Sequence, residues 1–209
     1  MNNNLFKAKN LAILTILYNI AEGVLSILFG AEEETLALFG FGLDSFVEVV
    51  SGIGILHMIL RMQKNPVEQR DNFERTALKI TGISFYILTA GLIMGSILNV
   101  IYDQKPESTT AGIIISIISI LTMYFLMNAK LKVGKALNSE AIVADANCTK
   151  TCFYLSFVLL FSSVSYEFFK VGYLDVLGSL GIAYFAFKEG KEAIEKSKST
   201  SLTCSCDCH

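Results

Sequence analysis

Two pairs of side chains with metal-binding chemistry occur at the same spacing in this sequence. Asp44 and Glu48 lie four residues apart in LFGFGLDSFVEVVSGIG, and Cys148 and Cys152 lie four residues apart in SEAIVADANCTKTCFYLSF. A four-residue spacing places both members of a pair on one face of an α-helix, one turn apart. Two carboxylates in that position repel each other unless a cation or a proton lies between them. The two pairs together could supply four ligands to one ion.

The types of ligand restrict the ions that such a site would bind. Thiolates in a tetrahedral site favour zinc, cadmium or a softer metal, whereas magnesium and calcium prefer oxygen ligands alone. Each pair also has a plain structural interpretation, because acids in a membrane helix can hydrogen-bond to neighbouring helices and cysteine often acts as a small apolar residue. The combination favours a mid-membrane metal site made by Asp44, Glu48, Cys148 and Cys152.

The segments that carry these side chains are too apolar for a soluble domain. Hydrophobic residues make up 53% of the 209 residues, and the mean hydropathy is +0.53. A helix needs about 20 apolar residues to cross a bilayer. The apolar stretches that meet or approach this length are residues 11–29, 36–60, 80–102, 108–129, 141–169 and 171–187. The sequence therefore predicts an all-α integral membrane protein, a bundle of six transmembrane helices that forms one domain over residues 1–196.

The charges between these stretches predict the orientation of the bundle. With six spans, both termini lie on the same side of the membrane. The loops of the opposite side contain only Lys105 and Lys170, together with the acidic run Glu32, Glu33 and Glu34. The positive-inside rule then places both termini in the cytoplasm. The basic residues expected on that side are Lys7, Lys9, Arg61, Lys64, Arg70, Arg75, Lys79, Lys130, Lys132, Lys135, Lys188, Lys191, Lys196 and Lys198.

Further polar residues inside the predicted spans also need an explanation, since a charge at membrane depth costs about 2.5 to 3.5 kcal/mol on insertion scales. Asn19 and Glu22 of the first span could both face the bundle interior. Glu22 would then carry protons or act as the counter-ion of Lys150, which points away from the cysteine pair. Asp145 is another intramembrane acid that must find a partner. His57 could pass metal or protons inward, or be an ordinary interfacial histidine.

The C-terminal residues form a second group of soft ligands. Cys204, Cys206, Cys208 and His209 lie within six residues of one another. We expect residues 197–209 to form a flexible cytoplasmic tail, where thiols stay reduced and could collect ions near the entrance. The alternative is a dispensable, disordered end.

At this level of detail the chain resembles the transmembrane domain of the cation diffusion facilitator, or cation efflux, family. ALFGFGLDSFVEVVSG resembles the second helix of that family, and LKVGKALNSEAIVADANCTKTC resembles the approach to its fifth helix. GYLDVLGSLGIAYFAFKEGKEAIEKS and NIAEGVLSILFG are similar to the sixth and first helices, so the resemblance covers residues 12–196. The family usually has His or Asp and then Asp where this chain has Cys148 and Cys152.

The resemblance implies a six-helix cation transporter, commonly a homodimer, that exports cytoplasmic metal in exchange for protons. It implies neither an enzyme nor a prosthetic group, and no basic stripe indicates nucleic-acid binding. The expected cargo is Zn²⁺ or a softer ion such as Cd²⁺ or Hg²⁺, with manganese and iron(II) least favoured. We expect the cytoplasmic domain that usually follows the sixth helix to be absent. The alternatives are a membrane thiol oxidoreductase that uses Cys148 and Cys152, and a membrane metal sensor without transport activity.

Overall fold

The computed structural model describes residues 2–33, 35–64, 71–102, 109–137, 140–170 and 173–198. Within these ranges it leaves out the side chains of residues 2, 3, 61–64, 71–78, 81, 140, 141, 144, 147 and 148. The described chain consists of six α-helices: α1 (Asn2–Glu32), α2 (Leu36–Lys64), α3 (Asp71–Tyr102), α4 (Thr110–Ala136), α5 (Glu140–Phe169) and α6 (Tyr173–Lys198). The all-α, six-helix prediction is confirmed.

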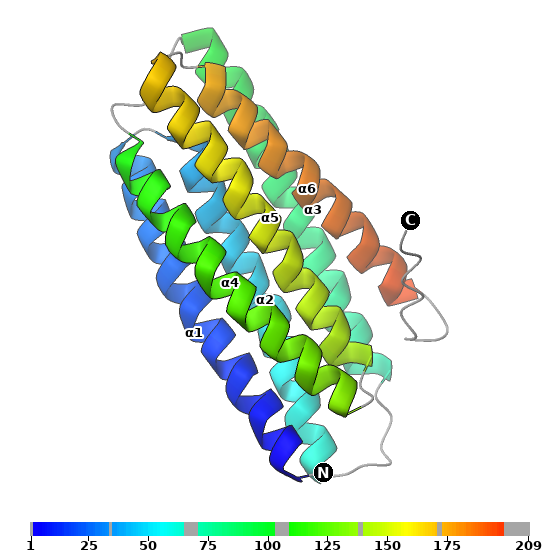
Figure 1. Cartoon of the computed structure of the whole chain (residues 1–209). Helices are drawn as coiled ribbons and strands as arrows, with labels where there is room; N and C mark the ends of the chain where they lie inside the picture. The colour runs from blue at the N-terminus through cyan, green and yellow to red at the C-terminus, as the bar shows by residue number, and fades with distance from the viewer. Residues whose placement is uncertain are drawn as a thin grey trace.

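The helices form one bundle in which each runs antiparallel to the next along the chain (Figure 1). Three pairs of helices pack most extensively, namely α1 with α2, α3 with α6, and α4 with α5. Contacts between these pairs are sparser, and α2 makes contacts with both α5 and α6. The first metal-ligand pair of the sequence lies on α2 and the second on α5, so this packing brings the two faces toward each other.

The outer surface of the bundle is that of a membrane protein. Large apolar side chains such as Leu17, Ile87, Phe125 and Phe161 are at least 60% exposed. A surface of this kind is stable when lipid surrounds it. The hydrocarbon of the bilayer offers no hydrogen-bond partners, and the backbone groups of an α-helix find theirs within the helix. Within the described residues, five helical segments are long and apolar enough to span a membrane: Asn4–Glu32, Leu36–Leu60, Gly82–Tyr102, Thr110–Ala136 and Thr149–Phe169.

Helix α6 is less apolar because charged residues are frequent in its last part, KEGKEAIEKSK. Small residues form the face that it turns toward the bundle, and its buried residues include Gly178, Ser179, Ala183, Ala186 and Gly190. A Cβ atom on Gly190 would lie 3.0 Å from the Cβ atom of Phe85 and 3.2 Å from the carbonyl oxygen of Gly82, so the backbones of α3 and α6 nearly touch there. Small residues at helix contacts permit this approach in membrane bundles.

Several helices extend beyond the apolar stretches from which they were predicted, and one extension changes an interpretation. Helix α4 continues to Ala136, so Lys130 lies inside the bundle with only 2% of its surface exposed. Its Nζ atom is 2.8 Å from Oδ2 of Asp145 and donates a hydrogen bond of 3.0 Å to Oγ1 of Thr149. The placement of Lys130 in an exposed loop is therefore wrong. A buried carboxylate on α5 needs a positive partner in a medium of low dielectric constant, and Lys130 is that partner.

Asp175 ties the beginning of α6 to the beginning of α2. Its Oδ2 atom accepts a hydrogen bond from the backbone N–H of Leu36 at 2.8 Å, and its Oδ1 atom accepts one from Ala37 at 3.2 Å. The first N–H groups of a helix have no partner within the helix, and a negative charge there also interacts favourably with the helix dipole. Asp175 is 1% exposed. It therefore caps α2 from a neighbouring helix.

Replacing Asp175 by alanine should lower the free energy of unfolding by about 1.5 to 3 kcal/mol, the usual contribution of a hydrogen bond to a charged group. The variant leaves two buried N–H groups of α2 without an acceptor. Unfolding of the purified protein by SDS titration in mixed micelles measures the change. Glu195→Ala is the control, because Glu195 is 64% exposed on the same helix. Equal stabilities of the two variants would contradict the proposed role of the cap.

Candidate metal site

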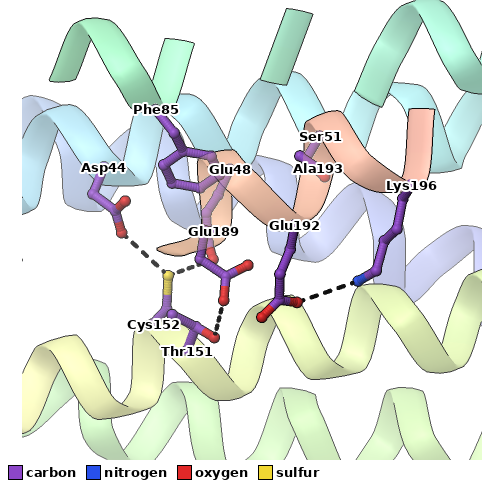
Figure 2. A pocket seen from close by; sticks show the side chains of 10 residues that line it. All are labelled: Asp44, Glu48, Ser51, Phe85, Thr151, Cys152, Glu189, Glu192, Ala193 and Lys196. Carbon is purple, nitrogen blue, oxygen red and sulfur yellow. Dashed lines mark hydrogen bonds and ion pairs between the residues drawn. The ribbon is translucent and has the colours of Figure 1, made fainter. Parts of the chain in front are cut away.

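Helices α2 and α5 bring Asp44, Glu48 and Cys152 into direct contact. Asp44 and Cys152 are almost fully buried, with exposed fractions of 1% and 4%, and Glu48 is half-buried. The Sγ atom of Cys152 lies within hydrogen-bonding distance of Oδ2 of Asp44, at 3.5 Å, and of Oε1 of Glu48, so the two acids share its one S–H proton. Figure 2 shows the thiol between the two carboxyl groups. Cys152 therefore contacts both acids.

These three side chains line a cavity of about 40 Å³. A cavity of about 10 to 15 Å³ already holds one water molecule, so this one has room for a metal ion. It extends toward the surface, since Glu192 and Lys196 in its wall are 43% and 42% exposed. The full lining is Asp44, Glu48, Ser51, Phe85, Thr151, Cys152, Glu189, Glu192, Ala193 and Lys196.

One oxygen atom of Asp44 lacks any partner. Its Oδ1 atom is buried and receives no hydrogen bond from the described part of the protein. By contrast, both carboxylate oxygens of Glu22 and of Asp175 accept hydrogen bonds. A buried carboxylate oxygen without a donor costs folding free energy, and a cation in the cavity would remove that cost.

Helix α1 supports the site from behind α2. The amide of Asn19, which is fully buried, donates a hydrogen bond of 2.9 Å from Nδ2 to Oε2 of Glu48. Glu22 accepts hydrogen bonds from the hydroxyls of Tyr18 at 2.8 Å and Ser45 at 3.1 Å. The inward orientation of Asn19 and Glu22 matches the expectation from sequence. The contact of Asn19 with Glu48 was missed, although an amide inside an apolar stretch signals that it needs a polar partner.

Two predicted accessory roles look different in the structure. Lys150 is exposed and its Nζ atom lies 5.8 Å from the ring centroid of Tyr154, so it is not the counter-ion of the buried Glu22. That prediction is wrong because position 150 faces away from the bundle interior. His57 is half-buried on α2 and does not line the cavity. Its role in an ion or proton path stays a prediction.

Part of the predicted ligand set lies outside the described residues. This applies to the side chain of Cys148 and to Cys204, Cys206, Cys208 and His209 of the tail. Among the described side chains, no three His, Cys, Asp or Glu residues are arranged around a point where a metal would sit. The S–H group of Cys152 lies between Asp44 and Glu48. A bound ion would take the place of that proton.

The sequence of the chain matches a known protein family. Residues 11–200 match the model of a family described as the cation efflux transmembrane domain. The chain belongs to the cation efflux family. This confirms the resemblance found in the sequence of its helices and places the α2–α5 contact inside the domain that defines the family.

Two relatives of this cation efflux domain are similar along most of its length. The manganese efflux system protein MneP of Bacillus subtilis (strain 168) is 24% identical over 201 residues, which cover 91% of this chain and 67% of that protein. An uncharacterized transporter of Methanocaldococcus jannaschii is 25% identical over 181 residues, which cover 84% of this chain and 63% of that protein. The chain thus spans about two thirds of the length of each relative.

Family membership also decides between classes of function. Cation efflux proteins are transporters of metal cations in the membrane and not enzymes. The thiol oxidoreductase alternative therefore has no support, and the five apolar spans fit a multi-pass protein embedded in lipid.

The buried pair of Lys130 and Asp145 provides a test of how the cation efflux bundle holds α4 against α5. Lys130→Met should lower the free energy of unfolding by about 3 to 5 kcal/mol, because it leaves a buried carboxylate unpaired. Adding Asp145→Leu should restore much of that loss. SDS titration of the wild type, both single variants and the double variant gives the coupling energy. Strictly additive effects would show that the pair is not coupled, and Lys150→Met serves as the exposed control.

Proposed function

We propose that this chain transports a divalent transition-metal ion through a mid-membrane site formed by Asp44, Glu48, Cys152 and Cys148. The observation that carries the proposal is the convergence of two carboxyl groups and a thiol on one cavity, where one oxygen of Asp44 has no partner among the described side chains. Intramembrane ionisable groups that face a cavity mark ion paths in membrane proteins. Membership of the cation efflux family supports the same conclusion.

The ligand chemistry favours zinc, cadmium or mercury as cargo. A thiolate binds borderline and soft ions more strongly than manganese, which prefers oxygen and imidazole ligands. The relative named as a manganese efflux protein supports a divalent transition metal in general. The sulfur of Cys152 between the two acids distinguishes the present chain as a candidate for softer ions.

Proton exchange follows from the same ligands. Carboxyl and thiol groups must lose their protons to coordinate a metal, so binding of the ion releases protons and protonation releases the ion. The S–H proton of Cys152 lies between Asp44 and Glu48, at the atoms that would coordinate the ion. We therefore propose proton-coupled efflux, in which the metal ion and the protons compete for the same ligand atoms.

The orientation of the transport cycle is part of the proposal. Basic residues gather on the side where α1 begins and α6 ends, which we assign to the cytoplasm. Metal would enter from that side, where the tail residues Cys204, Cys206, Cys208 and His209 could collect it. Relative movement of the helices would then expose the site to the opposite face. The homodimer that the family resemblance implies stays a prediction.

Loss of a ligand should abolish transport. Asp44→Asn and Cys152→Ala should each reduce zinc and cadmium uptake into proteoliposomes by at least about 100-fold, more than the 10- to 100-fold typical of groups that only support a metal ligand. The assay uses a fluorescent metal indicator inside the vesicles and an imposed pH gradient. Glu167→Gln, at the far end of α5, is the control. Full uptake by both site variants would exclude this site, and metal binding without flux in the wild type would identify a sensor.

Replacing the sulfur by an oxygen ligand should change which ion is preferred. Cys152→Asp replaces the thiol beside Asp44 and Glu48 by a further carboxyl group, and we expect the ratio of cadmium to manganese transport rates to fall at least about tenfold. Initial rates for both ions, measured in the same vesicles, give this ratio. Cys152→Ser is the matched control, because its neutral hydroxyl should weaken transport of both ions without favouring manganese. An unchanged ratio in Cys152→Asp would show that residue 152 does not determine selectivity.

A further inference from the structure

A third helix contributes a carboxyl group to the same cavity. Glu189 of α6 lines it, and its Oε1 atom accepts a hydrogen bond of 2.8 Å from Oγ1 of Thr151 on α5. Figure 2 shows the Glu189 carboxyl group beside Cys152, between the buried acids and the more exposed Glu192. Thr151 is the immediate neighbour of Cys152, so one turn of α5 holds both the thiol and the hydroxyl that orients Glu189.

The position of Glu189 is fixed by the packing of its neighbour. Gly190 lies against α3, where an added Cβ atom would be 3.0 Å from the Cβ atom of Phe85. Phe85 is itself part of the cavity wall. Residue 190 packs against α3. Successive residues of an α-helix are separated by about 100° around its axis, so residue 189 faces a different neighbour, α5. The approach of Glu189 to the cavity is therefore a consequence of close helix packing.

The balance of charge in the cavity calls for a cation. Its lining contains four carboxyl groups, those of Asp44, Glu48, Glu189 and Glu192, and one ammonium group, that of Lys196. Lys196 lies 3.6 Å from Glu192 and pairs with it. In the described part of the chain Glu189 forms no salt bridge, and its hydrogen bond comes from a neutral hydroxyl. The buried Oδ1 atom of Asp44 is the second independent sign of a missing cation.

We propose that Glu189 is a cation ligand that receives the metal ion from the open end of the cavity and passes it to Asp44, Glu48 and Cys152. This inference rests on the proposed transport function and adds a residue from α6 to it. The hydroxyl of Thr151 holds one carboxylate oxygen in place, which leaves the other oxygen for the ion. Glu189 therefore sets the affinity for metal on the side where α6 ends.

The competing explanation is structural, in which Glu189 only ties α6 to α5 through Thr151. Glu189→Gln separates the two, because its amide oxygen can still accept the hydrogen bond of Thr151 but carries no charge. Glu189→His is the complementary variant, since an imidazole nitrogen can also bind zinc. Glu195→Gln is the matched control on the same helix, where Glu195 is exposed and pairs with Lys191.

The experiment measures the rate of zinc uptake into proteoliposomes against zinc concentration, together with zinc binding to the purified protein by calorimetry. We expect Glu189→Gln to raise the half-saturating zinc concentration and the dissociation constant about tenfold or more, with the maximal rate within about twofold of the wild type. Glu189→His should recover most of the affinity. Glu195→Gln should match the wild type.

The outcomes distinguish this inference from the function on which it rests. Wild-type affinity in Glu189→Gln, with Asp44→Asn inactive, would overturn the role of Glu189 and leave the transport site intact. A lower maximal rate at unchanged affinity would also overturn it, since that result indicates a structural tie. Transport by Asp44→Asn would instead overturn the proposed function. If Glu189→Gln does not fold, Glu189→Ser removes the charge together with the hydrogen bond, and wild-type affinity in that variant would likewise overturn the role of Glu189.

Discussion

A polar group inside the hydrocarbon has no water to bind, so the protein itself must supply its partner, and this constraint organises the bundle. Lys130 and Asp145 satisfy it by pairing across α4 and α5. Glu22 satisfies it with hydroxyl donors from α1 and α2. Asp175 satisfies it by accepting two backbone N–H groups at the beginning of α2. Each buried charge that is satisfied in this way also holds two elements together, so the solvation of charge and the packing of helices are the same problem.

Among the described residues, Glu33 and Asp44 each depart from this rule at one carboxylate oxygen, and Asp44 differs from the half-buried Glu33 because it is almost fully buried beside a cavity. It is as deeply buried as Asp175, yet one of its oxygens has no donor within the described structure. A protein that needed only stability would gain by filling the cavity with an apolar side chain, because a half-satisfied buried acid is less favourable than none. The cavity beside Asp44, Glu48 and Cys152 therefore has a use for which stability is given up. Binding of a cation explains both the charge and the space.

The sequence predicts features that depend on one helix more reliably than features that depend on two. Length and hydropathy predict the helices, and the four-residue spacing correctly places Asp44 and Glu48 on one face, because both follow from the geometry of a single helix. The contact of Asn19 with Glu48 depends on how α1 lies against α2, which spacing does not encode. Hydropathy likewise predicts that α4 ends before Lys130, because a hydropathy value takes no account of the favourable interaction of Lys130 with Asp145. Close contacts between glycines and neighbouring helices set these relative positions.

The distribution of polar contacts shows how such a bundle could alternate its access. Most of the buried hydrogen bonds lie within the closely packed pairs α1–α2, α3–α6 and α4–α5, and would survive a movement of one pair against another. Among the described residues, the hydrogen bonds between pairs include two groups. At the end where α2 and α6 begin, Asp175 binds α2, Ser162 donates to the carbonyl of Leu174, and a carboxylate oxygen of Glu33 accepts from the backbone of α4. At the site itself, the pairs meet through Cys152 and through Glu189.

The first group of hydrogen bonds closes one end of the bundle, while the second group is made by the side chains that an ion would bind. Release of the ion toward the closed end would have to break the hydrogen bonds of Asp175, Ser162 and Glu33. An ion bound at the site would replace the hydrogen bonds of Cys152 and Glu189, and would so change the contacts that hold the three helix pairs at their present distances.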